Sequence, residues 1–156
     1  PYTESADKLP AISKYYDYDE GAPGKSAQSN GITCIYRYAE VLLMYAEAST
    51  RATNSVNQDA LNAIQEVQKR AGYQDRQIEL TTTTEPTAFL AAVSNERGWE
   101  FFAEMKRWFE LVRLEKVKEV RAEEWDASTF NTNHHYYFPV PYQQVDLAGW
   151  TNNAGY

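Results

Sequence analysis

The sequence predicts a mainly α-helical protein, built from a helical hairpin and long helices that are joined by extended loops. Residues 37–48 contain no glycine, proline, asparagine or aspartate, so nothing in them interrupts a helix. Residues 57–71 carry apolar side chains at helical spacing, and residues 86–112 form a longer stretch of the same kind. These three stretches define the predicted fold class.

The first predicted helix runs from about Ile35 to Arg51 and is apolar over most of its circumference. Its charged residues, Arg37, Glu40 and Glu47 together with Arg51, fall on one narrow stripe. A helix with so wide an apolar surface has to be surrounded by other elements. We therefore expect this helix to be central to a helical assembly.

A second helix is predicted from about Asn57 to Ala71, and with the first it makes a hairpin of tetratricopeptide-like size. Ser55 and Gln58 have the spacing of a capping box, and Gly72 stands where a left-handed residue ends a helix. One face of this helix is apolar: Ala60, Leu61, Ile64, Val67 and Ala71. No second copy at a 34-residue period is visible, so the sequence does not demonstrate a repeat array.

A long helical stretch is predicted to start at Pro86, because proline is tolerated in the first turn of a helix. Apolar residues continue to Val112, and Gly98 marks the place where we expect a bend or a break. The following residues are predicted to be irregular, except for a short extended piece at 136–141 that is ended by prolines. Residues 151–156 have the composition of a turn.

Residues 1–34 are predicted to be an irregular lead-in segment, with a short strand around Tyr15–Tyr18 and a loop of glycine, serine and asparagine. A domain rarely opens with about thirty irregular residues unless they pack on something. We therefore expect this segment to join a helical domain at residues 35–156 to an N-terminal part outside the sequence.

The composition argues against several classes of protein. The net charge is −7, whereas nucleic-acid binding needs clustered lysine and arginine. No run of about 18 apolar residues is available to cross a bilayer, and the first residues do not resemble a secretory signal. Cys34 is the only cysteine and follows no apolar segment, so we expect a buried structural thiol and not a lipid-anchoring residue.

Three glutamates, Glu96, Glu100 and Glu104, recur every four residues and would share one face of a helix. A functional interpretation makes them metal ligands or an acid/base pair, but no helix supplies the histidine of a di-metal bundle. Like charges at this spacing repel, so cations should compensate them. We favour a structural interpretation, in which bidentate pairs with Arg70, Arg97, Arg107 and Arg113 tie helices together.

Other polar clusters give little support for catalysis. His134 and His135 are adjacent and would point to opposite sides of an extended segment, so they cannot easily chelate one metal. Residues 17–20 offer Asp17, Asp19 and Glu20 as calcium ligands without the rest of an EF-hand, and a solvated acidic loop is favoured. No nucleophile motif, phosphate loop or zinc motif is present, so we expect no enzymatic activity, catalytic residue, metal or cofactor.

Aromatic residues make up 14% of the chain, and twelve of them are tyrosines. Tyrosine and tryptophan suit sugar binding, because the ring packs on the sugar while neighbouring polar groups bind its hydroxyls. The candidate ligand-binding residues outside the helices are Tyr15, Tyr16, Tyr18 and Trp125. Packing in a core or interface is the simpler interpretation of each one.

Blocks of sequence in a fixed order resemble the C-terminal region of the SusD/RagB family of nutrient-binding lipoproteins. They are RYAEVLLMYAEA (37–48), ALNAIQEVQKRAG (60–72), ERGWEFFAEMKRWFELVR (96–113), YFPVP (137–141) and NNAGY (152–156). The chain departs from the family pattern where Met105 replaces a glycine, which would let the helix continue through a bend that the family makes. Gln68 replaces an arginine, Glu110 an aspartate, Asn152 a glutamine and Ala154 a proline.

This resemblance implies a SusD-like α/α scaffold and a C-terminal helical domain at residues 35–156 of a longer protein. It further implies a non-catalytic role in capturing oligosaccharides, or peptides in some members, for a SusC-like TonB-dependent transporter. The implied location is the cell surface of a Bacteroidetes outer membrane, through a lipid anchor outside this chain. The alternatives are a tetratricopeptide-like protein–protein interaction module without a small-molecule ligand and, with less support, a carboxylate-based hydrolase.

Overall fold

The computed structural model describes residues 3–4, 10–11, 14, 34–120, 136–154 and 156. The chain divides into two compact units, residues 1–38 and 39–156. In the first unit, two short strands, β1 (Thr3–Glu4) and β2 (Pro10–Ala11), pair antiparallel. The strand predicted around Tyr15–Tyr18 lies outside the described residues. Cys34 is exposed, so the prediction of a buried thiol is wrong.

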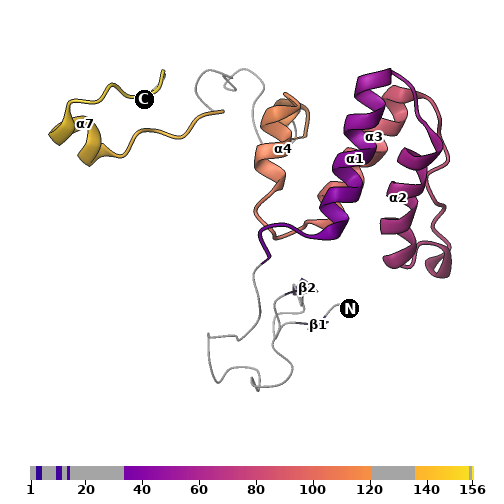
Figure 1. The fold of residues 1–156 in the computed structure, drawn as a ribbon. Coiled ribbons are helices and arrows are strands. Elements are labelled where there is room, and N and C mark those ends of the chain that lie inside the picture. Colours follow the sequence, from indigo (N-terminus) through magenta and orange to yellow (C-terminus); the bar gives the residue numbers. More distant parts are fainter. Residues whose placement is uncertain (1–2, 5–9, 12–13, 15–33, 121–135, 155) are drawn as a thin grey trace. The chain divides into compact units, whose positions relative to one another are not determined.

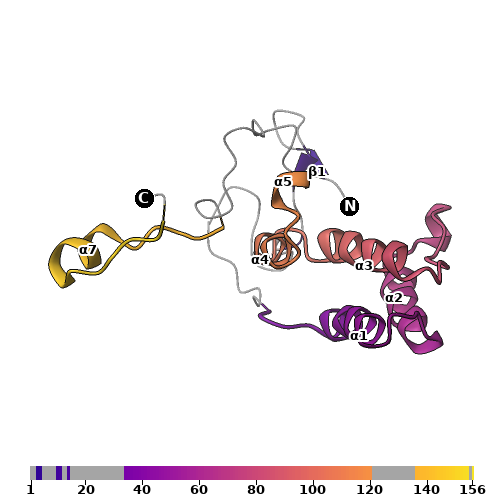
Figure 2. The ribbon, with the colours of Figure 1, turned by 90° about the horizontal axis from the view of Figure 1, so that it is seen from above.

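The rest of the described chain is mainly helical, which confirms the predicted fold class (Figure 1). Its elements are α1 (Tyr38–Thr53), α2 (Gln58–Arg70), the 3-10 helix η1 (Gln74–Arg76), α3 (Pro86–Glu100), α4 (Arg107–Arg113), α5 (Val117–Val120) and α7 (Tyr142–Ala148). Helices α1 and α2 form the expected hairpin, and α3 and α4 lie beside it in both views (Figures 1 and 2). Neither η1 nor α7 is predicted from the sequence.

The hairpin connection is capped differently from the expectation. Asn57 is the N-cap of α2, because its Oδ1 accepts a 2.7 Å hydrogen bond from the amide of Ala60. Asn57 Nδ2 also donates to Ser49 Oγ at the end of α1, at 2.8 Å, which ties the two helices at their connection. Ser55 and Gln58 bond elsewhere, so the predicted capping box is wrong.

The end of α2 confirms the role expected of Gly72. This glycine has φ +79, and its amide donates to the carbonyl of Lys69 while the amide of Tyr73 donates to that of Gln68. The two bonds have the pattern of a Schellman motif, which only a residue in the left-handed region closes without strain. The chain therefore turns sharply into η1.

The core of the helical unit lies between α1, α2 and α3. Its buried apolar residues are Leu43, Ala46, Ala60, Ala63, Ile64, Val67, Phe89, Val93 and Phe101. Phe89, Leu43 and Ile64 are fully buried, and burial of each such side chain contributes about 1.5–3 kcal/mol. Ala46 on α1 and Ala60 and Ala63 on α2 contribute small side chains to this core.

Helix α3 begins as expected and ends earlier than expected. Glu85 is its N-cap and accepts hydrogen bonds from the amides of Thr87 and Ala88, with Pro86 in the first turn. The helix then continues through Gly98 and ends at Glu100. The expected break at Gly98 is therefore absent, and the chain turns several residues later.

The turn between α3 and α4 contains two non-glycine residues with positive φ. Ala103 has φ 65 and Met105 has φ 58, both in the left-handed region that costs an ordinary residue about 1–2 kcal/mol. The expectation that Met105 would let the helix continue is wrong, because α3 ends at Glu100 and Met105 itself has a left-handed backbone conformation. The side chain of Met105 is exposed and gains no packing in return.

Gly98 has a packing role instead of a bending role. A Cβ atom at this position would lie 3.1 Å from Cζ of Arg107, closer than most real Cβ contacts. The Arg107 guanidinium thus lies directly over the backbone of α3, where its Nη1 donates to the carbonyl of Ser94 at 2.8 Å. Glycine at position 98 allows this approach.

The described C-terminal residues form a closed loop around α7. Asn152 Oδ1 accepts from the amide of Val140 at 2.8 Å, and Asn153 Nδ2 donates to the carbonyl of Phe138 at 2.6 Å. Tyr156 OH donates to the carbonyl of Tyr137 at 3.1 Å. The blocks YFPVP and NNAGY, which are separate in sequence, therefore bind each other at the base of this loop.

Candidate functional site

The polarity of α1 differs from the expectation. Its charged stripe faces the interior, where Glu40 is 5% exposed and Glu47 is 9% exposed. Part of its apolar surface is exposed instead, including Val41 and Tyr45. The helix is therefore not surrounded by the other described elements. Its buried face is held by charge pairs with α3 and α4, and these pairs form the most distinctive polar site of the helical unit.

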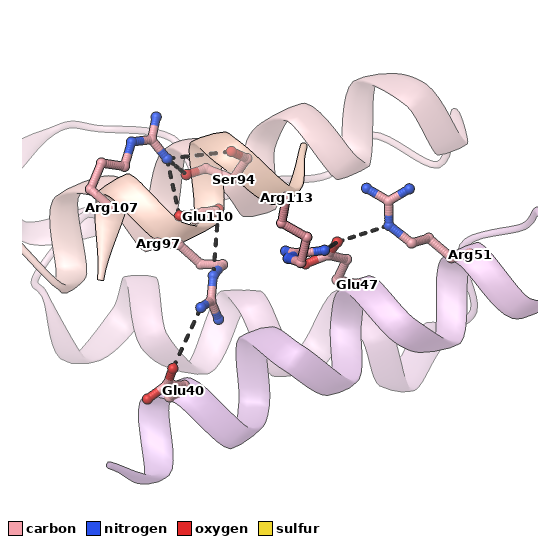
Figure 3. Close-up of polar contacts among 8 residues, drawn as sticks. All are labelled: Glu40, Glu47, Arg51, Ser94, Arg97, Arg107, Glu110 and Arg113. Atoms are coloured by element: carbon pink, nitrogen blue, oxygen red, sulfur yellow. Dashed lines mark hydrogen bonds and ion pairs between the residues drawn. The ribbon is translucent and has the colours of Figure 1, made fainter. Parts of the chain in front are cut away.

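Glu47 on α1 is held by two arginines. Arg113, at the end of α4, donates from Nη1 to Oε1 at 2.7 Å and from Nη2 to Oε2 at 2.9 Å, which is a bidentate pair. Arg51, one turn along α1, donates from Nε to Oε1 at 2.8 Å. Figure 3 shows Glu47 between these two guanidinium groups. The Glu47–Arg113 pair joins α1 to α4 across 66 residues of sequence.

Arg97 on α3 lies between two buried carboxylates. Its Nη2 is 3.5 Å from Glu40 Oε1, and its Nε is 3.4 Å from Glu110 Oε1 on α4. Each carboxylate has a second cation, since Lys106 Nζ is 2.6 Å from Glu40 Oε2 and Arg107 Nη1 is 3.2 Å from Glu110 Oε2. Three helices therefore meet at Arg97, whose side chain points down from α3 towards α1 (Figure 3).

The regularly spaced glutamates of the predicted signature fall into three different settings. Glu100 pairs with Arg70 on α2. Glu96 is 1% exposed and accepts hydrogen bonds from Tyr73 OH at 2.6 Å and Gln68 Nε2 at 3.2 Å. Glu104 follows the end of α3, so the expectation that all three share one helix face is wrong.

The structural interpretation of the Glu–Arg signature is confirmed in part, because arginine–glutamate pairs tie helices together but mostly through other glutamates than expected. Arg70 pairs with Glu100, whereas Arg97, Arg107 and Arg113 pair with Glu40, Glu47 and Glu110. Among the described residues, the Arg113–Glu47 pair is bidentate. Four of the pairs join different elements: Arg70–Glu100, Arg97–Glu40, Arg97–Glu110 and Arg113–Glu47. The sequence places Glu40 and Glu47 on one stripe but does not identify them as the partners, because their seven-residue spacing shows a shared face and not which helix covers it.

The pKa values near Glu47 reflect competing effects. Burial raises the pKa of the Glu47 carboxyl, but hydrogen bonds and positive charge from Arg113 and Arg51 outweigh burial and hold it below its ordinary value. The hydrogen bond to Glu47 raises the pKa of Arg113. The pair is therefore ionised at neutral pH.

Pockets on the helical unit include two that are lined by described residues. One has a volume of about 330 Å³ and lies between α1, α3 and α4: Met44, Glu47, Ala48, Arg51, Arg97 and Arg113 line it. The other has a volume of about 480 Å³ and lies beside α2 and η1: Gln65, Gln74, Gln77, Ile78, Glu79, Leu80 and Thr82 line it. Both volumes fall in the range of small-ligand sites.

The four predicted ligand-binding residues, Tyr15, Tyr16, Tyr18 and Trp125, lie outside the described residues, as do His134, His135 and the acidic cluster at 17–20. Within the described ranges, no three histidine, cysteine, aspartate or glutamate side chains lie close enough together to share a metal ion. No helix in these ranges has both the length and the hydropathy needed to cross a membrane.

Comparisons with known proteins agree on one family. A model described as the SusD family matches residues 1–156. SusD-like protein P25 of Formosa agariphila is 27% identical over 144 residues, which cover 89% of this chain and 26% of that protein. SusD-like protein P2 of the same organism is 28% identical over 164 residues, with 99% and 32% covered. The chain thus spans about a quarter to a third of the length of these relatives.

Solved structures show the same relationship. A crystal structure of a SusD superfamily protein from Parabacteroides distasonis superposes with a TM-score of 0.70 at 28% identity. The superposition covers 85% of this chain and 29% of the Parabacteroides distasonis chain. A SusD homolog from Bacteroides thetaiotaomicron gives a TM-score of 0.65 at 26% identity, with 85% and 30% covered. The helical arrangement described above is therefore shared with both proteins.

Proposed function

The chain belongs to the SusD family, and from this premise we propose that it is the C-terminal helical scaffold of a glycan-binding protein for nutrient uptake. Proteins of this family are non-catalytic binding proteins that are generally associated with the outer membrane. The observation that carries the proposal is the match of the family model to the whole chain, supported by the shared helical arrangement of two SusD structures.

We propose that the partner is a SusC-like TonB-dependent transporter. Under this proposal the protein holds an oligosaccharide, or a peptide, at the entrance of the transporter. A lipid anchor outside this chain fixes it to the cell surface. The ion-paired helices support the proposal as scaffold, because charge pairs between α1, α3 and α4 give this region a fixed geometry without adding a reactive group.

We propose that Tyr15, Tyr16, Tyr18 and Trp125 contact the glycan. The proposal rests on their chemistry, since each offers a flat apolar ring with polar neighbours in sequence such as Asp17. Stacking on a sugar ring needs no hydrogen-bonding partner at a fixed angle, so it suits ligands that differ in linkage. Replacement by alanine should weaken glycan binding without lowering the stability of the helices.

The test is isothermal titration calorimetry of the protein encoded by the native gene against a panel of neutral and acidic oligosaccharides and peptides. Saturable binding of a glycan, weakened at least tenfold by Trp125→Ala and unchanged by Trp150→Ala, would support both the function and the site. Trp150 is a matched control because it is a described, exposed tryptophan of the C-terminal segment. Failure of every glycan and peptide to bind would refute the proposal, and hydrolysis of a bound sugar would favour the carboxylate-based hydrolase instead.

The protein–protein alternative is favoured by one observation, the exposed apolar face of α1. Val41, Tyr45 and Ala48 follow one another at spacings of four and three residues and are all exposed. This spacing is typical of a helix that packs against another helix. A tetratricopeptide-like module would bind a protein partner through such a face and would give no heat with any saccharide or short peptide.

A further inference from the structure

The ion pairs between α1, α3 and α4 carry more positive than negative charge. Among the described residues, two separate groups of pairs, one at Glu47 and one at Arg97, together contain the carboxylates of Glu40, Glu47 and Glu110 and five cations: Arg51, Arg97, Lys106, Arg107 and Arg113. The excess is two positive charges, in a chain whose net charge is −7. Cations that are partly removed from water attract an anion more strongly than those on an open surface.

Part of this excess charge lies at the 330 Å³ pocket. Three arginines and one glutamate line it, and both oxygens of that glutamate already accept hydrogen bonds from Arg113. Arg97 is 8% exposed, and its Nη1 is buried with no hydrogen-bond acceptor among the described residues. A buried donor without an acceptor costs free energy, so a hydrogen-bond acceptor placed at Nη1 would stabilise the folded protein.

Arg51 adds donors from the side of the pocket. It binds Glu47 through Nε alone, and its two Nη groups point away from that carboxylate (Figure 3). Its side chain is 49% exposed, so a ligand can reach it from solvent. Met44 and Ala48 on α1 supply an apolar wall beside these donors. The pocket therefore combines cationic donors with a surface for the carbon skeleton of a ligand.

We propose that this pocket is a binding site for an oxyanion group, such as the carboxylate of a sugar acid or an inorganic sulfate. The oxygens of the anion accept hydrogen bonds from Arg51 and Arg97, and Arg113 adds positive charge while it holds Glu47 away from the ligand. The planar donors of a guanidinium match the geometry of a carboxylate. Neutral sugars lack the charge that balances the site and are not held there.

This inference concerns the charge of one pocket and is independent of whether the protein takes up glycans. The source of the oxyanion is distinguished by the probes. Sodium sulfate represents a free inorganic anion, sodium D-glucuronate represents a sugar acid, and D-glucose is the neutral match for glucuronate. Sodium chloride keeps the ionic strength constant, because general screening would otherwise weaken exposed pairs and change the melting temperature.

The test measures binding to the protein encoded by the native gene, by thermal shift and by the NMR signals of the arginine Nε–H groups. We expect saturable stabilisation by sulfate or glucuronate and none by glucose, with shifted Nε–H signals for Arg51 and Arg97. Arg51→Gln should weaken binding about tenfold, because it removes charged hydrogen bonds from the site. Arg76→Gln changes the net charge equally at an exposed position of η1 and should leave binding unchanged.

Sulfate binding assigns the site to any small oxyanion, whereas binding of glucuronate alone assigns it to organic carboxylates. The proposal is overturned if neither anion binds saturably. It is also overturned if Arg51→Gln and Arg76→Gln bind equally well. The NMR measurement on the unmodified chain needs no variant, so a variant that fails to fold does not remove the test.

Discussion

Replacement of Arg97 by methionine tests whether the buried ion pairs hold the helices together. Methionine has a similar length and no charge, so the change removes the link from α3 to Glu40 and Glu110 with little loss of packing. Among the described residues, Arg97 forms ion pairs with carboxylates on both α1 and α4. Its guanidinium also lies 5.3 Å from the ring of Phe101, and this cation–π contact disappears in the variant.

The expected loss follows from the geometry. Removal of one partner from a buried pair costs about 3–5 kcal/mol when the other charge is left alone. Here Lys106 still compensates Glu40 and Arg107 still compensates Glu110. The lost contacts are 3.4 and 3.5 Å long, which is longer than an ideal charge-assisted hydrogen bond. We therefore expect the free energy of unfolding to fall by about 2–3 kcal/mol, at or below the lower end of that range.

The assay is urea denaturation of residues 1–156 at pH 7, followed by far-ultraviolet circular dichroism. Arg76→Met is the matched control, because Arg76 is exposed and its replacement should change stability by less than about 0.5 kcal/mol. A loss below 1 kcal/mol in Arg97→Met, with an unchanged slope against urea, would refute the reasoning. It would mean that the desolvation of Arg97 offsets its attraction to the two carboxylates.

The remaining predictions concern acid stability and backbone conformation. Because the folded-state pKa of Glu47 is lowered, its contribution to stability is complete above its unfolded pKa of about 4.3 and is lost as pH falls through the lower folded value. Glu47→Gln should therefore reduce the loss of unfolding free energy between pH 7 and pH 3, measured by urea titrations. An unchanged loss at low pH would contradict the assignment. Gly98→Ala gains about 1 kcal/mol of helix propensity but displaces Arg107, so we expect the free energy of unfolding to fall by about 0.5–1 kcal/mol. In the Arg107→Ala background the same substitution should raise the free energy of unfolding, and equal effects in both backgrounds would rule out the contact. Met105→Gly should raise the unfolding free energy by about 0.5–1 kcal/mol by relieving the positive φ, whereas Met105→Val should lower it, and the opposite order in thermal denaturation would count against strain at this residue.

Local signals in the sequence predicted the elements with local causes. Gly72 ends α2 because the left-handed region favours glycine, and Pro86 stands in the first turn of α3 because that position needs no amide. The pairing of arginines with glutamates was also predictable, because buried charges need compensation. Compensation of charge does not specify which helix supplies the partner. The sequence therefore indicated that helices are tied together by charge, but not which helices.

Features that depend on the surroundings were predicted poorly. Met105 adopts a positive φ because the chain has to reverse between α3 and α4, and methionine has no local preference for that conformation. Gly98 suggested a break, but its reason is the approach of Arg107 from the next helix. The polarity of α1 depends on which face meets α3 and α4, and the composition of one helix does not contain that information. The candidate ligand residues lie outside the described chain and stay predictions.

The inward charged stripe of α1 has a consequence for mutational tolerance. In most helices of water-soluble proteins, a glutamate accepts substitution easily and a large apolar residue does not. In this unit the order is reversed, because Glu40 and Glu47 are buried whereas Val41 and Tyr45 are exposed. Random mutagenesis scored by folding of this unit alone would therefore retain glutamate at 40 and 47 and allow drift at 41 and 45. If natural relatives of this protein nevertheless keep Val41 and Tyr45, this would indicate selection for a property other than the stability of this unit.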